Sequence, residues 1–238
     1  MKQKPPAPTR RERKHEATRA EIMDTARRQM AEHGAAAFSL RAIAREMQLT
    51  APALYRYFPN RDELVTALIV EAYNSLADAL EAAREAEPVG AHAKRLFAGG
   101  IAYREWALAH PQDYALIFGT PIPGYHAPEE QTNPAAKRAM DALIETLVAA
   151  WQADQLDPAQ EYSKPAPALQ KQLAAWKKNF GYTAPTQALH LALVCWSRLH
   201  GLTSLELFHQ IQPMVTAPAD LYRAEVLALL TSAGLKLE

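Results

Sequence analysis

A single cysteine, Cys195, stands in the 238-residue sequence, which excludes a disulfide framework within one chain. Its neighbours are apolar and no histidine is spaced to activate it, so we expect a buried structural thiol rather than a nucleophile. No stretch approaches 18 consecutive apolar residues, and the N-terminus is polar and basic without an apolar signal core. We therefore expect a cytoplasmic protein that has no membrane partner.

The sequence also lacks the common motifs of enzymes. It contains no Gly-x-Ser-x-Gly, no His-Glu-x-x-His and no phosphate-binding loop, and its eight histidines and one cysteine show no metal-ligand spacing. We therefore predict that the protein is not an enzyme, with no catalytic residue, no metal site and no cofactor.

Charges of the two signs are equal in number but unevenly distributed. Of the 26 basic and 26 acidic residues, 13 basic and 6 acidic residues lie in residues 1–61. The remaining 177 residues hold 13 basic and 20 acidic groups, so the N-terminal quarter carries +7 and the rest carries −7. Only the N-terminal quarter is therefore suited to meet a polyanion.

Helical periodicity runs through almost the whole chain, and the alternation typical of strands never persists. We expect an all-α fold with a three-helix head, a larger C-terminal helical bundle and about nine or ten helices in total. Prolines among basic residues predict a flexible arm at 1–17, and Thr18 with Glu21 forms a capping box that starts the first helix. The expected domains are the arm at 1–17, the head at 18–63 and the body at 64–238.

Glycines and prolines mark the expected helix ends. Gly34 ends the first helix, Pro111 stops the helix before it, and Pro134 opens a later helix at its first turn. We expect a loop at 119–133 and a proline-bearing break at 157–167. Helices are expected at 18–33, after Ser39, after Thr50, at 61–85, around 96–108, at 111–118, 134–151, around 169–176, and at 185–208 and 219–235.

The most informative segment, 39–64, reads SLRAIAREMQLTAPALYRYFPNRDEL. Ser39 is a good N-cap for one short helix, and Thr50 is the N-cap of a second helix with Pro52 in its first turn. Gln48 and Leu49 interrupt the pattern between them, which predicts a tight turn. Two short helices joined in this way are typical of a helix-turn-helix that reads DNA.

The next helix begins directly after this motif. Asn60 and Glu63 have capping-box spacing, which places Arg61 at the exposed first position of the helix. A cation at the positive end of a helix dipole requires an anionic partner. This position therefore agrees with a polyanionic ligand.

Residues Thr18 to about Leu68 resemble the DNA-binding head of the tetracycline-repressor family of bacterial transcription regulators. The resemblance rests on LTAPALYRYFPNRDEL, which has the family's small residue after a hydroxyl cap, its Leu-Tyr, a further aromatic residue, Phe, and a basic residue opening the connector helix. The sequence departs from the family at Gln48, where glycine is common in the turn.

This resemblance implies roles for individual residues of the head. It implies that Arg41 reads guanine through O6 and N7, while Ala51, Pro52 and Ala53 can offer only apolar contacts to bases. For Tyr55 and Tyr57 the alternative role is core packing, and for Arg41 it is a position on a solvated helix face. The basic arm could enter a minor groove of DNA or stay solvated. The hydroxyls and the cation that would hold phosphates are Ser39, Thr50, Tyr55, Tyr57 and Arg61.

The family also implies a homodimer that places two heads about 34 Å apart on a palindromic double-stranded DNA operator. Its last two long helices form the interface, which here would be 185–208 and 219–235. The apolar stripe of the final helix could serve either the core or the partner. Candidate interface residues are Trp196, Tyr222, Val226 and Leu229.

A second resemblance covers WSRLHGLTSLELF, in which Trp196, His200 and Gly201 are similar to a regulator C-terminal domain with a Trp-His-Gly signature. His200 could touch an effector or be a satisfied core residue. Gly201 is expected to allow close helix packing or to mark a kink.

A small-molecule effector is implied by the family and by no motif of the chain. In the family, the effector favours a body conformation that swings the connector helix and misplaces the heads. Ordinary core packing explains the same candidate residues equally well. The candidates are Phe97, Tyr103, Trp106, Tyr114, Phe118, Met140, Leu147, Trp151 and His200.

The expected function is a DNA-binding transcriptional regulator, a ligand-responsive repressor that binds its operator as a dimer. The alternative is an architectural or cell-division DNA-binding protein that uses the same head without a small-molecule effector. Release of DNA by a ligand would distinguish the two.

Overall fold

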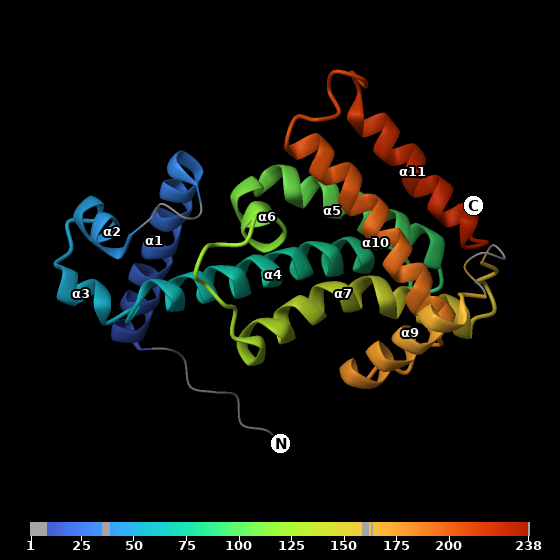
Figure 1. Cartoon of the computed structure of the whole chain (residues 1–238), viewed down its shortest axis with the longest axis horizontal. Helices are drawn as coiled ribbons and strands as arrows, with labels where there is room; N and C mark the ends of the chain where they lie inside the picture. Colours follow the sequence, from blue (N-terminus) through green and yellow to red (C-terminus); the bar gives the residue numbers. More distant parts are fainter. Residues whose placement is uncertain (1–8, 35–38, 159–161, 163, 238) are drawn as a thin grey trace. The chain divides into compact units, whose positions relative to one another are not determined.

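The computed structural model describes residues 9–34, 39–158, 162 and 164–237 (Figure 1). Within these residues the chain forms ten helices and no strand, which confirms the all-α prediction. No described helix is both long and apolar enough to span a bilayer. The helices are α1 (Arg10–His33), α2 (Leu40–Glu46), α3 (Ala51–Tyr55), α4 (Arg61–Glu85), α5 (His92–Ala109), α6 (Pro111–Phe118), α7 (Glu129–Gln152), α9 (Pro167–Phe180), α10 (Thr186–Leu207) and α11 (Pro218–Ser232).

The chain divides into two compact units. The first comprises residues 1–72 and 112–132, and the second comprises residues 73–111 and 133–238. The helix α4 belongs to both, because its residues up to Ala72 lie in the first unit and the others in the second. The first unit therefore extends beyond the head expected at 18–63, since it also includes the first turns of α4 and the segment 112–132.

The first helix starts earlier than predicted. Thr9 accepts a hydrogen bond from the Glu12 amide at 3.2 Å, and Glu12 accepts one from the Thr9 amide at 2.6 Å, so a capping box opens α1 at Arg10. The predicted start at Thr18 is wrong, and residues 10–17 of the expected arm are helical. Residues 1–8 of that arm lie outside the described residues. Gly34 ends the helix with a φ of 84°, as predicted.

The helix α7 also begins earlier than predicted. Pro134 lies inside it rather than in its first turn, and the helix starts at Glu129, within the expected loop. The Pro128 carbonyl accepts hydrogen bonds from the Thr132 amide and hydroxyl at 3.0 and 3.1 Å, which stabilise the turns before the proline. Proline costs the helix one backbone hydrogen bond, and the helix tolerates this loss near its N-terminal end.

In the first unit, apolar residues from α1, α2 and α3 form a core. Ile22, Ile43 and Leu54 are fully buried, and each contributes roughly 1.5–3 kcal/mol by leaving water. Polar contacts add the segment 112–132 to this unit. Arg27 of α1 donates to the Asp113 carboxylate at 2.8 Å, and Thr66 of α4 shares a 2.8 Å hydrogen bond with the Tyr125 hydroxyl.

In the second unit, α5 packs against α10 and α11. A Cβ at Gly100 would lie 3.2 Å from Val226, so the missing side chain lets α11 approach α5 closely. The Tyr222 hydroxyl donates to the Gly100 carbonyl at 2.8 Å. At Gly201, by contrast, a Cβ would meet no atom of the described residues within 4 Å, so packing within the chain does not require this glycine.

Candidate nucleic-acid interface

Local hydrogen bonds fix both short helices of the helix-turn-helix. The Ser39 hydroxyl accepts from the Ala42 amide at 3.2 Å, and the Thr50 hydroxyl accepts from the Ala53 amide at 3.3 Å. Both cap residues are exposed. Each hydroxyl therefore stands at the positive end of a helix, where it remains accessible to an anion.

The turn between the two helices depends on a residue in a left-handed conformation. Gln48 has a φ of 55°, a region that L-residues other than glycine rarely adopt. The backbone thus takes the conformation expected of the family's turn without the family's glycine. Gln48 lies two residues before Thr50, the N-cap of α3, so this turn leads directly into that helix.

Side chains of α3 and the residues after it divide between core and solvent. Leu54 and Phe58 are buried and hold the helix on the core, whereas Tyr55 is 41% exposed. Tyr57 is partly buried and stacks on His15 of α1, with ring centroids 4.6 Å apart and planes at 26°. The core-packing alternative therefore holds in part for Tyr57, while Tyr55 faces solvent.

Three arginines of this motif point into solvent without a carboxylate partner among the described residues. They are Arg41 and Arg45, four residues apart on α2, and Arg56 at the end of α3. The nearby Glu46 is held by Arg28 at 3.0 Å and by Gln29 at 2.8 Å. Hydrogen bonds from Gln29 and Arg28 lower the pKa of Glu46, so its negative charge is already neutralised by α1.

Arg45 and Arg56 were not among the predicted contact residues. Arg45 could have been found from its spacing, because a residue four positions after Arg41 lies on the same helix face. The predicted Ala51 and Ala53 are partly buried and Pro52 is exposed. Arg61 is partly buried at the first position of α4, where the Asn60 side chain accepts from the Glu63 amide at 2.9 Å as predicted.

The unpredicted start of α1 adds a second basic element to this surface. Arg10, Arg11 and Lys14 are exposed on its first two turns. The stacking of His15 on Tyr57 connects this part of α1 to the end of α3. A rigid helix therefore carries basic groups that were expected on a flexible arm.

The nine predicted effector residues are distributed over both compact units. Tyr114 and Phe118 lie in the first unit, where their rings meet edge to face at 5.2 Å, and the other seven lie in the second. Leu147 is buried in the apolar core of the second unit, with Phe97 and Met140 packed against it, whereas Trp151 is 38% exposed. These residues remain a prediction.

Three of the predicted effector residues have polar contacts inside the second unit. The Tyr103 hydroxyl lies 2.9 Å from Nδ1 of His200, and His200 stacks on Trp196 with ring centroids 5.1 Å apart. Burial lowers the pKa of His200, which favours the neutral ring. Trp106 donates to the Ser75 hydroxyl at 3.0 Å. Packing and hydrogen bonds within the chain thus account for all three positions.

The predicted interface stripe of α11 lies inside the chain. Tyr222, Val226 and Leu229 are at most 3% exposed, and Tyr222 and Val226 face Gly100 of α5. Their assignment to a dimer interface is therefore corrected, because a side chain buried in its own core cannot meet a partner. Trp196 is only partly buried.

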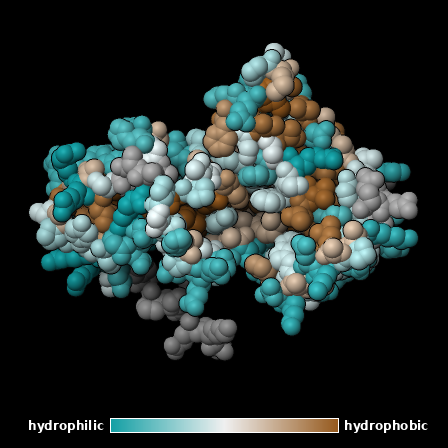
Figure 2. Space-filling model, viewed as in Figure 1, coloured by the Kyte–Doolittle hydropathy of each residue, from teal (hydrophilic) through white to brown (hydrophobic). Residues whose placement is uncertain are grey.

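Other apolar residues of the last two helices, and Phe208 directly after α10, are exposed instead. Figure 2 shows hydrophobic side chains gathered over α10 and α11. Their exposed fractions lie between 37% and 47%, and they are Leu193, Leu205, Phe208 and Leu227. Sequence periodicity could not identify them, because a helix packed on both sides carries two apolar faces.

A groove of about 240 Å³ lies on α7 and the connection between α9 and α10, and none of the nine predicted effector residues lines it. Its walls combine charged and apolar groups, among them Lys137, Asp141 and Val148 of α7 and Tyr182 of the connection.

Comparison with known proteins gives matches over both parts of the chain. Residues 22–68 match the model of bacterial regulatory proteins of the tetR family, and residues 96–229 match a tetracyclin repressor-like C-terminal domain. The chain is 34% identical over 207 residues to the HTH-type transcriptional regulator Rv1816 of Mycobacterium tuberculosis, which covers 87% of this chain and 88% of the relative. The regulator Mb1846 of Mycobacterium bovis matches to the same extent.

Solved structures agree with these matches. The crystal structure of the regulatory protein SCO4313 is 42% identical in sequence, has a TM-score of 0.78, and covers 94% of this chain and 100% of its own. A tetR-family regulatory protein from Rhodococcus RHA1 has the same fold, with 17% identity, a TM-score of 0.61, and coverage of 92% and 98%.

Proposed function

The chain belongs to the tetracycline-repressor family of bacterial regulatory proteins and is a DNA-binding transcriptional regulator, and we propose that it is a repressor that binds a palindromic operator as a dimer. A small-molecule effector then releases it from DNA. The observation that carries this proposal is the group of unpaired, exposed arginines around two capped helix starts in the first unit.

In this proposal the head first grips the DNA backbone. The hydroxyls of Ser39 and Thr50 and the Tyr55 phenol hold phosphates, together with Tyr57 and Arg61. The exposed basic residues at the start of α1 contact further phosphates and thereby extend the same surface. These contacts set the position of the head on DNA and make its affinity strongly dependent on salt.

In this proposal, residues of α2 make most of the sequence-specific contacts with bases. Arg41 is long enough to reach a guanine edge, and Arg45 on the same face is a second candidate. Ala51, Pro52 and Ala53 at the start of α3 contribute apolar contacts, for example with thymine methyl groups. A site read by so few polar groups requires two heads for useful specificity.

Dimerisation would use the exposed apolar residues of α10 and α11, with Leu193, Leu205 and Leu227 in place of the buried stripe that the sequence suggested. Burial of these leucines against a second copy removes apolar surface from water and favours association. The partly buried Trp196 remains a candidate at the edge of this face.

Selection of bound fragments from the host genome, followed by titration of one fragment, tests the proposal. We expect a short palindrome, a complex of two chains per site, and an affinity that falls steeply with added salt. Recovery of fragments without a shared sequence would contradict operator recognition. Failure of every tested metabolite to release the selected fragment would favour the architectural alternative.

A further inference from the structure

The groove on α7 already contains a cation, which the chain itself provides. The Lys137 ammonium donates to Oδ2 of Asp141 at 2.6 Å and lies 4.5 Å from the centroid of the Tyr182 ring. A carboxylate and an aromatic face are the two groups that together favour an organic cation. Lys137 is 34% exposed, so its flexible side chain can leave the groove for solvent at little cost.

The carboxylate at this site is not fully satisfied. Its second oxygen, Oδ1 of Asp141, is buried and accepts no hydrogen bond from the described residues. A buried acceptor without a donor costs free energy, which a ligand with an N–H group would recover. The Tyr182 hydroxyl lies near the Asp141 carboxylate, and burial together with this neighbour raises the pKa of Tyr182, so the ring remains a neutral phenol. The hydroxyl does not complete a hydrogen bond to Oδ1 of Asp141, which keeps room for a second donor.

The rest of the groove defines the size and polarity of the ligand. Val148 of α7 and Ala184 after Tyr182 provide apolar wall, and Glu145 adds a second carboxylate. At about 240 Å³ the groove is smaller than the roughly 300–1,000 Å³ that is usual for drug-sized ligands. This space suits a short apolar chain that ends in one charged group.

We propose that this groove binds a small organic cation, a primary amine with a short apolar tail, which takes the place of the Lys137 ammonium between Asp141 and Tyr182. The ammonium donates to both oxygens of Asp141, and the tail lies along Val148 and Ala184. A quaternary ammonium has no N–H donor and binds more weakly, since it leaves Oδ1 of Asp141 unsatisfied.

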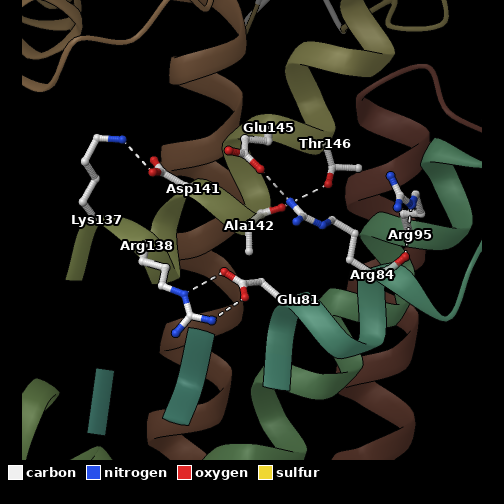
Figure 3. Close-up of polar contacts among 9 residues, drawn as sticks. All are labelled: Glu81, Arg84, Arg95, Lys137, Arg138, Asp141, Ala142, Glu145 and Thr146. Carbon is white, nitrogen blue, oxygen red and sulfur yellow. Dashed lines mark hydrogen bonds and ion pairs between the residues drawn. The ribbon is translucent and has the colours of Figure 1, made fainter. Parts of the chain in front are cut away.

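The helix α7, which forms one wall of the groove, also contacts the connector helix α4 within the second unit. Figure 3 shows Arg84 of α4 reaching Glu145, with Nη1 at 2.8 Å from Oε2, and Arg138 of α7 paired with Glu81 of α4. Arg84 is only 17% exposed. A bound ammonium competes with Arg84 for the charge of Glu145 and weakens one of the ties between α7 and α4.

This connection gives the groove a regulatory role, a step that rests on the proposed function. The helix α4 carries Arg61 at its first residue and Arg84 near its last. A ligand that prefers the state with a weakened Arg84–Glu145 pair shifts the population of α4 conformations. The amine would therefore lower affinity for DNA.

Binding of 1-hexylamine to the full chain without DNA, measured by calorimetry, tests the site itself. We expect hexylamine to bind, and 1-hexanol and hexanoate of the same tail length to give no signal. Lys137→Met should bind hexylamine about tenfold more tightly, because the internal competitor is gone. Asp141→Asn should bind it about tenfold more weakly.

Two further variants distinguish a specific loss of binding from a folding defect. Lys171→Met removes an exposed lysine of α9 that does not line the groove, and should leave hexylamine affinity unchanged. Tyr182→Leu keeps an apolar wall but loses the ring face, and should weaken binding. Equal binding of hexylamine and hexanol, or weaker binding by Lys137→Met, would overturn the proposal.

Titration of a selected genomic fragment in the presence of hexylamine separates the site from its regulatory role. We expect DNA affinity to fall about fivefold or more at saturating amine, and the effect to disappear in Arg84→Met. Amine binding without any change in DNA affinity would contradict the regulatory role and leave the site standing. Loss of fragment binding in all conditions would instead contradict the proposed function.

Discussion

The two compact units of this chain differ in how their functional residues are placed. In the first unit, exposed arginines and capped helix starts present charge to solvent on short elements. In the second, large apolar and aromatic residues are distributed over a core to which five of the described helices contribute, α5, α7, α9, α10 and α11. The DNA-binding head can therefore be recognised from short sequence motifs, namely helix caps and nearby arginines. No comparable motif marks a ligand-binding site in the second unit.

Both units are stabilised by contacts between residues that lie far apart in the sequence. Polar contacts between distant residues, such as Arg27 with Asp113, join the segment 112–132 to the first unit. The second unit also has ion pairs between distant residues, such as Arg104 with Glu206 and Arg84 with Glu145, and it adds close helix packing at Gly100. Both units therefore combine an apolar core with ion pairs between segments that lie far apart in the sequence.

Removal of the carboxylate of Asp113 is expected to have the largest effect on stability. Arg27 and Asp113 have side chains that are 19% and 8% exposed, so Asp113→Ala leaves a half-buried guanidinium paired only with the exposed carboxylates of Asp24 and Glu71. The free energy of unfolding should fall by about 2 kcal/mol. Urea unfolding measures it.

The double variant Arg27→Met with Asp113→Leu provides the control, because it replaces the pair by apolar groups of similar size. It should recover most of the lost stability. A loss in the double variant as large as in Asp113→Ala would show that the charge pair is not the cause.

A charge on the outer face of α11 should break the dimer without unfolding the chain. Leu227 is 39% exposed, so Leu227→Glu adds a charge that a partner would have to bury. We expect the dimer dissociation constant to rise at least about a hundredfold, since burying an unpaired charge costs several kcal/mol. Analytical ultracentrifugation provides the measurement.

Val89→Glu, at an exposed position outside the last two helices, is the matched control and should remain dimeric. Val226→Ala should lower stability and keep the dimer, because Val226 is only 3% exposed. Dissociation by Val226→Ala at unchanged stability would restore the interface that the sequence suggested.

The difference between the units explains how much of the structure could be predicted from the sequence. Ser39, Thr50 and Asn60 were identified correctly because capping needs only the residues within one turn. The start of α1 was missed although Thr9 and Glu12 have capping-box spacing, since the nearby prolines and basic residues favoured an arm. Pro134 was placed in a first turn because proline is common there.

The body was harder to predict for a different reason. A stripe such as Tyr222, Val226 and Leu229 has the same spacing whether it faces its own core or a partner. The groove on α7 could not be predicted because its walls come from two distant segments, around Asp141 and around Tyr182. Only the folded chain brings such groups together.

The turn of the head offers a smaller test of local sequence control. Gln48 has a φ of 55°, so Gln48→Gly should relieve strain and raise the free energy of unfolding by up to about 1 kcal/mol. Gln48→Val should lower it, because a β-branched residue tolerates positive φ poorly. Higher stability of the valine variant in thermal unfolding would contradict the strained turn.

The smallest expected effect concerns pH and the second unit. Burial lowers the pKa values of His200 and His92 below their ordinary range, so the unfolded chain binds protons more readily than the folded chain. Stability should therefore fall as the pH drops below about 6.5, the usual pKa of histidine. Melting temperatures between pH 7.5 and pH 5.5 measure this loss.

His200→Gln should reduce the pH-dependent loss, since the side chain no longer titrates. His126→Gln removes an exposed histidine of the first unit and serves as the matched control for the loss of one histidine. An equal slope in wild type and His200→Gln would show that His200 does not contribute.

The first unit is proposed to bind DNA through many phosphate contacts and to recognise its sequence through few base contacts. DNA titrations of Arg61→Ala and Arg41→Ala test this proposal most directly. Affinities for one selected operator and its single-base variants are measured over a series of salt concentrations. Arg61→Ala should weaken binding to all sequences and reduce the salt slope by about one, whereas Arg41→Ala should relax the preference at one base pair. Equal, sequence-independent losses in both variants would contradict the account.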